Sequence, residues 1–277
     1  MSIYRREEMS RLVKWVFGAP LIVILFLALS LIMPTSASGY RMVLVLNILS
    51  YCIFLMVTLI VIRYFLKFPL GKLFCFERPF SPRNLFLGLA GMGVMGVGTS
   101  FIWMALAPDK FSFALQGGWP LDFLLSIIVV ILAALLEEIL CRSYIAYFVK
   151  DELETRTKQK ILYCLASGAA FMVFHFQNPE TASAGFAYAY IFYFLMGFSL
   201  MAVYLATGGI EAPLGIHIAN NLVNALFFTY PDAALKTNAL FLHDETPGPL
   251  MLVQAAVCIA ASVFICIRFA ERSQKAA

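Results

Sequence analysis

The sequence predicts an all-α integral membrane protein, a polytopic bundle of about eight transmembrane helices. Composition is the first reason, because 62% of the 277 residues are hydrophobic and only 13% are charged. An ordinary soluble domain is about half apolar and about one quarter charged. The second reason is a mean hydropathy of +0.86. The third is that the apolar residues form long runs without alternation, which favours helices over barrel strands.

A transmembrane helix needs about 20 mostly apolar residues. Applied in order along the chain, this criterion gives spans at 15–34, 42–66, 85–107, 121–149, 161–177, 184–207, 211–230 and 250–269. The fifth and seventh are shorter or more polar than the others. The first resembles a signal peptide, but its apolar run exceeds the usual length of about 7–15 residues, so we interpret it as a retained span. We expect residues 1–277 to form a single membrane domain without a soluble domain.

The basic residues predict the orientation of these spans. Eight spans place both termini on one side, and cytoplasmic loops carry an excess of Lys and Arg. With both termini in the cytoplasm, 16 of the 20 basic residues lie inside. These are Arg5, Arg6, Arg11, Lys14, Arg63, Lys67, Lys72, Arg78, Arg83, Lys150, Arg156, Lys158, Lys160, Arg268, Arg272 and Lys275. Arg41, Lys110 and Lys236 lie outside, and Arg142 lies within a span. We therefore expect a multi-pass plasma-membrane protein with cytoplasmic termini.

Net charge and cysteine spacing exclude other classes. A net charge of +4 with dispersed basic residues does not indicate a nucleic-acid partner. The six cysteines form no C-x-x-C pair, so they indicate neither a disulfide framework nor a zinc motif. His243 lies in a polar outer loop beside two acids, and we expect it to be solvated.

Two adjacent acids interrupt the fourth apolar run. Each ionised side chain at this depth costs on the order of 3 kcal/mol. Glu138 and Arg142 are four residues apart, which favours an ion pair on one helix face. Glu137 points about 100° away from that face and has no basic partner on its own helix. Because an ion pair needs one acid, Glu137 is a surplus carboxyl group.

Polar residues on two later spans accompany this acid. His175 lies in the fifth span, and His217 and Asn221, four residues apart, share a face of the seventh. Alone, an intramembrane His or Asn most often provides an interhelical hydrogen bond. Together with a surplus acid, such groups can converge in the core of a bundle. The sequence therefore predicts an intramembrane polar site, with its core at about 121–230.

These groups suit the hydrolysis of an amide bond. Glu137 can take a proton from water, while His175 holds that water or shares the proton. His217 and Asn221 can donate hydrogen bonds to the oxygen that becomes negative. Arg142 fixes Glu138, so this pair has a supporting role. No serine or cysteine nucleophile is required.

A zinc mechanism uses the same atoms. Glu137, His175 and His217 could bind Zn²⁺, which would acidify a water molecule. The chain lacks H-E-x-x-H, the spacing that preorganises two ligands on one helix. We favour direct activation of water by glutamate and histidine, so we expect no cofactor and keep zinc as the alternative.

At these residues the chain resembles the CAAX protease and bacteriocin-processing (CPBP) intramembrane proteases, relatives of the type II CAAX prenyl endopeptidase. Three family motifs occur in order. E-E-x-x-x-R is seen at 137–142, F-x-x-x-H at 171–175 and H-x-x-x-N at 217–221. Each motif alone is weak, but three in order within membrane spans are fairly specific.

The resemblance implies an eight-helix fold with an intramembrane catalytic cavity that opens toward the cytoplasm. It implies Glu137 and His175 as the water-activating pair, and His217 and Asn221 as the oxyanion site. It also implies membrane-tethered, prenylated or hydrophobic peptide substrates. Bacterial members of the family are associated with bacteriocin self-immunity and peptide-signal processing.

Two other functions stay open on the sequence. A non-catalytic immunity or scaffold protein could use the same helices to hold another membrane protein. A transporter could use the intramembrane acid and histidines to relay protons or bind a cation. The absence of an internal repeat and the Glu138–Arg142 pair make the transporter the weaker of the two.

Overall fold

The structure is a computed structural model that describes residues 3–30, 39–75, 79–146, 157–183, 185–245 and 248–270. The ends of the predicted spans 15–34 and 121–149 and the first residue of the span 184–207 lie outside these residues. So do five basic residues that entered the orientation argument, namely Arg78, Lys150, Arg156, Arg272 and Lys275.

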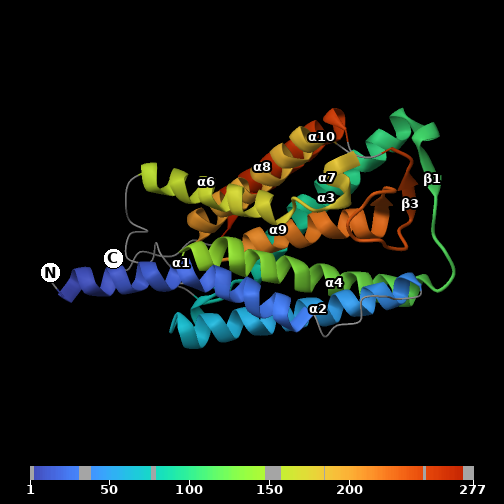
Figure 1. Ribbon diagram of the computed structural model, residues 1–277. Coiled ribbons are helices and arrows are strands. Elements are labelled where there is room, and N and C mark those ends of the chain that lie inside the picture. Colours follow the sequence, from blue (N-terminus) through green and yellow to red (C-terminus); the bar gives the residue numbers. More distant parts are fainter. Residues whose placement is uncertain are drawn as a thin grey trace.

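Helices dominate the described chain, which confirms the predicted all-α bundle (Figure 1). The longer helices are α1 (Ile3–Ser30), α2 (Tyr40–Ile60), α3 (Pro82–Leu106), α4 (Trp119–Glu138), α6 (Thr157–Phe174), α8 (Phe186–Thr207), α9 (Glu211–Leu222) and α10 (Pro249–Phe269). Two short helices are α5 (Tyr144–Ala146) and α7 (Pro179–Ser183). Wider π-helical turns continue α2, α4 and α9, namely η1 (Val61–Phe65), η4 (Ile139–Ser143) and η5 (Val223–Phe227). The 3₁₀ turns are η2 (Leu70–Lys72) and η3 (Pro108–Lys110).

Five helical segments of the described chain are long and apolar enough to cross a membrane, so the chain is an integral membrane protein. They are Tyr40–Phe65, Pro82–Leu106, Trp119–Ala146, Phe186–Thr207 and Pro249–Phe269. The predicted spans 15–34, 161–177 and 211–230 correspond to α1, α6, and α9 with η5, which do not meet both criteria. The count of eight therefore stays a prediction.

The bundle has two distinct ends (Figure 1). At one end α1, α3, α6 and α9 begin and α2, α8 and α10 finish, and we call it the basic end. The other, the sheet end, carries β1 (Phe111–Phe113), β2 (Phe228–Thr229) and β3 (Phe241–His243). Strand β3 is central, antiparallel to β1 and parallel to β2.

Two sequence expectations about the sheet end are wrong. The last part of the predicted span 211–230 is not helical, because Phe228 and Thr229 pair with β3. His243 is not solvated, because only 4% of its surface is exposed. Its Nδ1 atom donates to the Glu245 carbonyl at 2.6 Å, and its ring lies edge-on to that of Phe111. The expectation rested on the polar residues next to His243 in sequence, whereas its burial depends on the pairing of β3 with β1, which places Phe111 against the ring.

Glycines bring α3 and α9 into backbone contact. A Cβ atom at Gly88 would overlap the carbonyl oxygen of Ala212, and one at Gly215 would overlap that of Leu85. Close approach of this kind is common between membrane helices, because small residues let backbones touch. Gly168 and Gly197 have the same role between α6 and α8. These contacts set the positions of His217 on α9 and of His175 after α6.

Candidate active site

Glu138 and Arg142 form the predicted ion pair at the point where α4 widens into η4. The Arg142 Nε atom lies 3.0 Å from Glu138 Oε2, and both side chains are fully buried. The guanidinium also lies 5.1 Å from the centre of the Phe171 ring, within the range of a cation–π contact. This pair therefore ties α4 to α6, the helix that precedes His175.

The second oxygen of Glu138 holds His217. Glu138 Oε1 lies 2.8 Å from His217 Nδ1. Since this carboxylate is the ion-pair partner of Arg142, Nδ1 is the donor and Oε1 the acceptor. This hydrogen bond joins residues 79 positions apart, so no pattern on a single helix indicated it. It directs the opposite ring nitrogen, Nε2, toward Glu137.

Glu137 lies between the two histidines. Its Oε2 atom is 3.6 Å from His175 Nε2 and 3.6 Å from His217 Nε2. Both distances exceed those of direct N–H···O bonds, about 2.7–3.2 Å. Its side chain is 19% exposed, whereas that of Glu138 has no exposed surface. The surplus acid identified in the sequence thus faces imidazoles and the cavity, while its neighbour is enclosed by Arg142 and His217.

His175 is held in one orientation by contacts on several sides. Its Nδ1 atom lies 2.7 Å from the Phe171 carbonyl oxygen, which can only accept, so Nδ1 carries a proton. In the neutral ring the lone pair is therefore on Nε2, the atom that faces Glu137. The ring stacks on Tyr193 with 4.1 Å between centroids, and Thr181 Oγ1 donates to the His175 carbonyl.

Asn221 lies one turn after His217 on α9 and contributes to the wall of the cavity. Its Oδ1 atom accepts a hydrogen bond of 3.0 Å from Asn220 Nδ2. This bond fixes which end of the carboxamide is the oxygen and leaves the Asn221 amino group outside that contact.

A cavity of about 610 Å³ adjoins these residues. Glu137, His175 and Asn221 line it, whereas His217 is 2% exposed and is not among the lining residues. His217 therefore lies behind Glu137. The structure brings Glu137, Glu138, Arg142, His175 and His217 into one connected cluster and places Asn221 on the same cavity.

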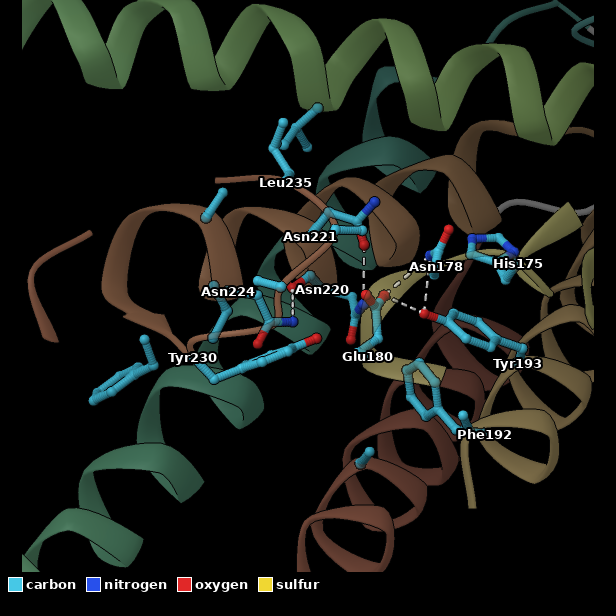
Figure 2. A pocket seen from close by; sticks show the side chains of 18 of the residues that line it. His175, Asn178, Glu180, Phe192, Tyr193, Asn220, Asn221, Asn224, Tyr230 and Leu235 are labelled. Atoms are coloured by element: carbon cyan, nitrogen blue, oxygen red, sulfur yellow. Dashed lines mark hydrogen bonds between the residues drawn. The ribbon is translucent and has the colours of Figure 1, made fainter. Parts of the chain in front are cut away.

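Sequence reasoning missed a second polar group on this wall (Figure 2). Glu180 Oε1 accepts from Asn178 Nδ2 at 3.0 Å and from the Tyr193 hydroxyl at 2.5 Å. Tyr193 also stacks on His175, so the hydrogen bonds of Asn178 and Tyr193 to Glu180 help to fix the position of the imidazole. A signal was present, because Asn178 and Glu180 follow His175 almost directly. Both lie just beyond the predicted span 161–177, so the rule that marks polar residues within membrane spans does not reach them.

Among the described residues, no group of three or more His, Cys, Asp and Glu side chains is arranged to hold a metal ion. The zinc alternative would use Glu137, His175 and His217. In the described geometry the two Nε2 atoms point at the same carboxylate oxygen of Glu137.

An acid between two imidazoles, inside apolar helices and beside a cavity, can activate a water molecule for hydrolysis. Comparison with known proteins agrees with this class of reaction. Residues 119–223 match the family described as "Type II CAAX prenyl endopeptidase Rce1-like", which confirms the resemblance seen in the three motifs. At the family level the chain is similar to CAAX-type intramembrane proteases.

One curated relative is the "Uncharacterized protein YyaK" of Bacillus subtilis (strain 168). The two chains are 28% identical over 170 residues, which cover 61% of this chain and 55% of the relative. The chain thus spans about half the length of that relative. No solved structure matches the chain.

Proposed function

We propose that this protein is an intramembrane endopeptidase of the CAAX-protease type, in which Glu137 and His175 activate water. One observation carries the proposal. Glu138 contacts both Arg142 and His217, whereas Glu137 Oε2 lies at equal distance from two imidazole nitrogens and has no Lys or Arg partner among the described residues. The match of residues 119–223 to the Rce1-like family supports the reaction class.

The first step uses the free atoms of Glu137 and His175. A water molecule on the cavity side of this pair loses a proton to the Glu137 carboxylate while its oxygen attacks the peptide carbonyl carbon. His175 Nε2 accepts a hydrogen bond from the same water, since Nδ1 already donates to Phe171. The carbonyl π bond opens, and its electrons move to the oxygen.

The second step requires donors for that oxygen. The Asn221 amino group, on the cavity wall, is the first. We assign His217 Nε2 as the second, which requires the Glu137 side chain to move from between that nitrogen and the cavity. His217 Nδ1–H is committed to Glu138, so Nε2 donates only when the ring carries both protons. When the carbon–nitrogen bond breaks, the proton held by Glu137 passes to the leaving amine. The products are a carboxylic acid and an amine, and the protein returns to its initial state.

The surroundings indicate the kind of substrate. Glu137 lies at the end of α4, far along a membrane-spanning segment, so a folded soluble protein would not reach it. A membrane-tethered, lipidated or hydrophobic peptide segment would, with membrane lipid as the surrounding partner. We further propose that residues 1–277 act as one membrane domain with a catalytic core at 121–230, in the plasma membrane, and without a cofactor.

The test compares membrane peptides from cells with the wild-type protein and with Glu137→Gln. Since a general base contributes about 10²–10⁴-fold, Glu137→Gln should lose at least about 100-fold of the cleavage while folded protein is retained. Glu245→Gln, a change of the same type on an exposed side chain, is the matched control. Near-normal cleavage by Glu137→Gln would remove the proposed role, and full complementation by Glu137→Ala with His175→Ala would favour a scaffold. Stoichiometric zinc that is needed for turnover would replace this mechanism with the metal version.

A further inference from the structure

Two expectations from the sequence are incompatible in this fold. The basic residues place both termini in the cytoplasm, and the family resemblance places the mouth of the cavity there too. In the structure α1 begins and α10 finishes at the basic end of the bundle (Figure 1). If the cavity reaches solvent at the sheet end, only one of the two expectations can hold.

The lining of the cavity extends to the sheet end. It includes a residue from each strand, Phe111 of β1, Phe228 of β2 and His243 of β3. Gly248, just before α10, also lines it, and the α10 lining residues end at Cys258, about halfway along the helix. No described residue of η1, η2, α5 or the second half of α10 is among the lining residues.

Exposure along α9 and η5 rises in the same direction. Every residue from Glu211 to Ala219 is buried. Asn220 and Asn221 are partly exposed, and Asn224, one turn further, is exposed. All three asparagines line the cavity, as Figure 2 shows. The accessible surface of this segment therefore begins at Asn220 and lies on the part nearer the sheet end.

Among the described residues, the basic end is closely packed. From Glu138 to Ala146 every residue is buried except Leu140, which is partly exposed. The 66–75 segment lies over this region and is held by two hydrogen bonds. Ser143 Oγ donates to the Leu73 carbonyl, and the Ile210 N–H donates to the Phe74 carbonyl. A hydrophobic cluster that includes Tyr204 contains residues of both the 66–75 segment and the 138–146 segment.

Charge then decides which end is cytoplasmic. The described residues at the basic end include seven cations, Arg63, Lys67, Lys72, Arg83, Lys158, Lys160 and Arg268. At the sheet end the described cations are three, Arg41, Lys110 and Lys236, of which Arg41 is paired with Asp122 and Lys110 with Glu245. The positive-inside rule counts Lys and Arg in short loops, and it assigns the basic end to the cytoplasm.

We infer that the cavity opens to the extracytoplasmic face of the membrane. If the proposed function holds, the substrate is a peptide segment that enters from the outer leaflet or the outer aqueous phase. The cytoplasmic mouth implied by the family resemblance does not apply to this chain. The direction of opening depends on charge and packing and is independent of the reaction.

Cysteine labelling in oriented membrane vesicles tests the direction. Among the described cysteines only Cys52 is exposed, so Cys52→Ser provides the background. Asn224→Cys and Ala234→Cys place a thiol on the cavity wall, and Lys160→Cys places one at the basic end. A membrane-impermeant maleimide should label the first two only in right-side-out vesicles and Lys160→Cys only in inverted vesicles. The reverse pattern overturns the inference. So does labelling of the cavity thiols in detergent but from neither side of the membrane.

A second measurement separates this inference from the proposed function. Intact cells with Asn224→Cys are treated with the impermeant maleimide, and Glu137-dependent peptides are then counted. Treatment should lower their yield at least 10-fold, with no effect in the Cys52→Ser background. If labelling occurs but the yield is unchanged, substrate does not enter through this opening and that part of the inference fails. If no Glu137-dependent peptides exist in any sample, the proposed function fails while the labelling result stands.

Discussion

Two adjacent glutamates lie in opposite environments, Glu138 in the closely packed part of the bundle toward the basic end and Glu137 beside the cavity. Toward the basic end, Glu138 is enclosed with Arg142 and His217, and nothing of its side chain is exposed. Toward the sheet end, Glu137 borders a cavity with amide and phenol groups on its walls. The difference shows how one helix can hold two acids in a membrane. One pairs with the guanidinium and holds the histidine, and the other borders the cavity, where we propose that it activates water.

Removing the cation from the closely packed part of the bundle should have the largest effect on stability. Arg142→Leu leaves Glu138 buried without its guanidinium, and breaking a buried pair costs about 3–5 kcal/mol. We expect a strong loss of folded protein, measured by size-exclusion chromatography and thermal unfolding in detergent. Adding Glu138→Gln should restore part of it. If Arg142→Leu were as stable as the wild-type protein, the Glu138–Arg142 pair would not contribute to the stability of the bundle.

Removing an amide from the cavity wall should affect activity and leave stability intact. Asn221→Ala should lower kcat about 10²–10³-fold, the usual cost of one oxyanion donor. Asn224→Ala, a matched change one turn along the same cavity wall, should stay within about 2-fold. Equal losses in both variants would assign the effect to the polar wall as a whole instead of to Asn221.

The contact between α3 and α9 should show a smaller effect. Gly88→Ala forces a methyl group against the Ala212 carbonyl, and overpacking of this kind costs about 1–3 kcal/mol. Gly98→Ala lies on the same helix with no atom within 4 Å of the added carbon, so it should be neutral or slightly stabilising. Thermal unfolding of the two variants side by side measures the difference. A Gly88→Ala protein as stable as Gly98→Ala would contradict the close approach.

The smallest effect is expected from the exposed ion pair of the sheet end. Lys110 beside Glu245 lowers the pKa of the Glu245 carboxyl, and Glu245 raises the pKa of the Lys110 ammonium. A carboxyl with a lowered folded-state pKa contributes stability above its unfolded pKa and loses it as pH falls. Both groups are solvent-exposed, so Lys110→Met should leave the midpoint of thermal unfolding unchanged at neutral pH. A clear shift that vanishes in high salt would assign this pair a structural role.

Local rules predicted part of the site correctly. The Glu138–Arg142 pair followed from a spacing of four residues, and it formed although the helix widens at Ile139–Ser143. That His217 and Asn221 share one helix followed from the same rule. The contact of Glu138 with His217 was not predictable in this way, because it depends on how closely α4 approaches α9. The Tyr193–Glu180 contact has the same origin, since α7 and α8 had to fold back against His175.

The sequence by itself determined the membrane class, the apolar helices, the surplus acid Glu137 and the end of the bundle that carries the positive charge. These are properties of composition and of residues a few positions apart, which hydropathy and helical geometry fix without any knowledge of packing. Only the tertiary structure decided that two imidazoles face Glu137, that His243 is covered by a sheet, and which segments line the cavity. Those features arise where helices touch or fail to touch, and this depends on side-chain volumes and backbone approach between segments far apart in the chain.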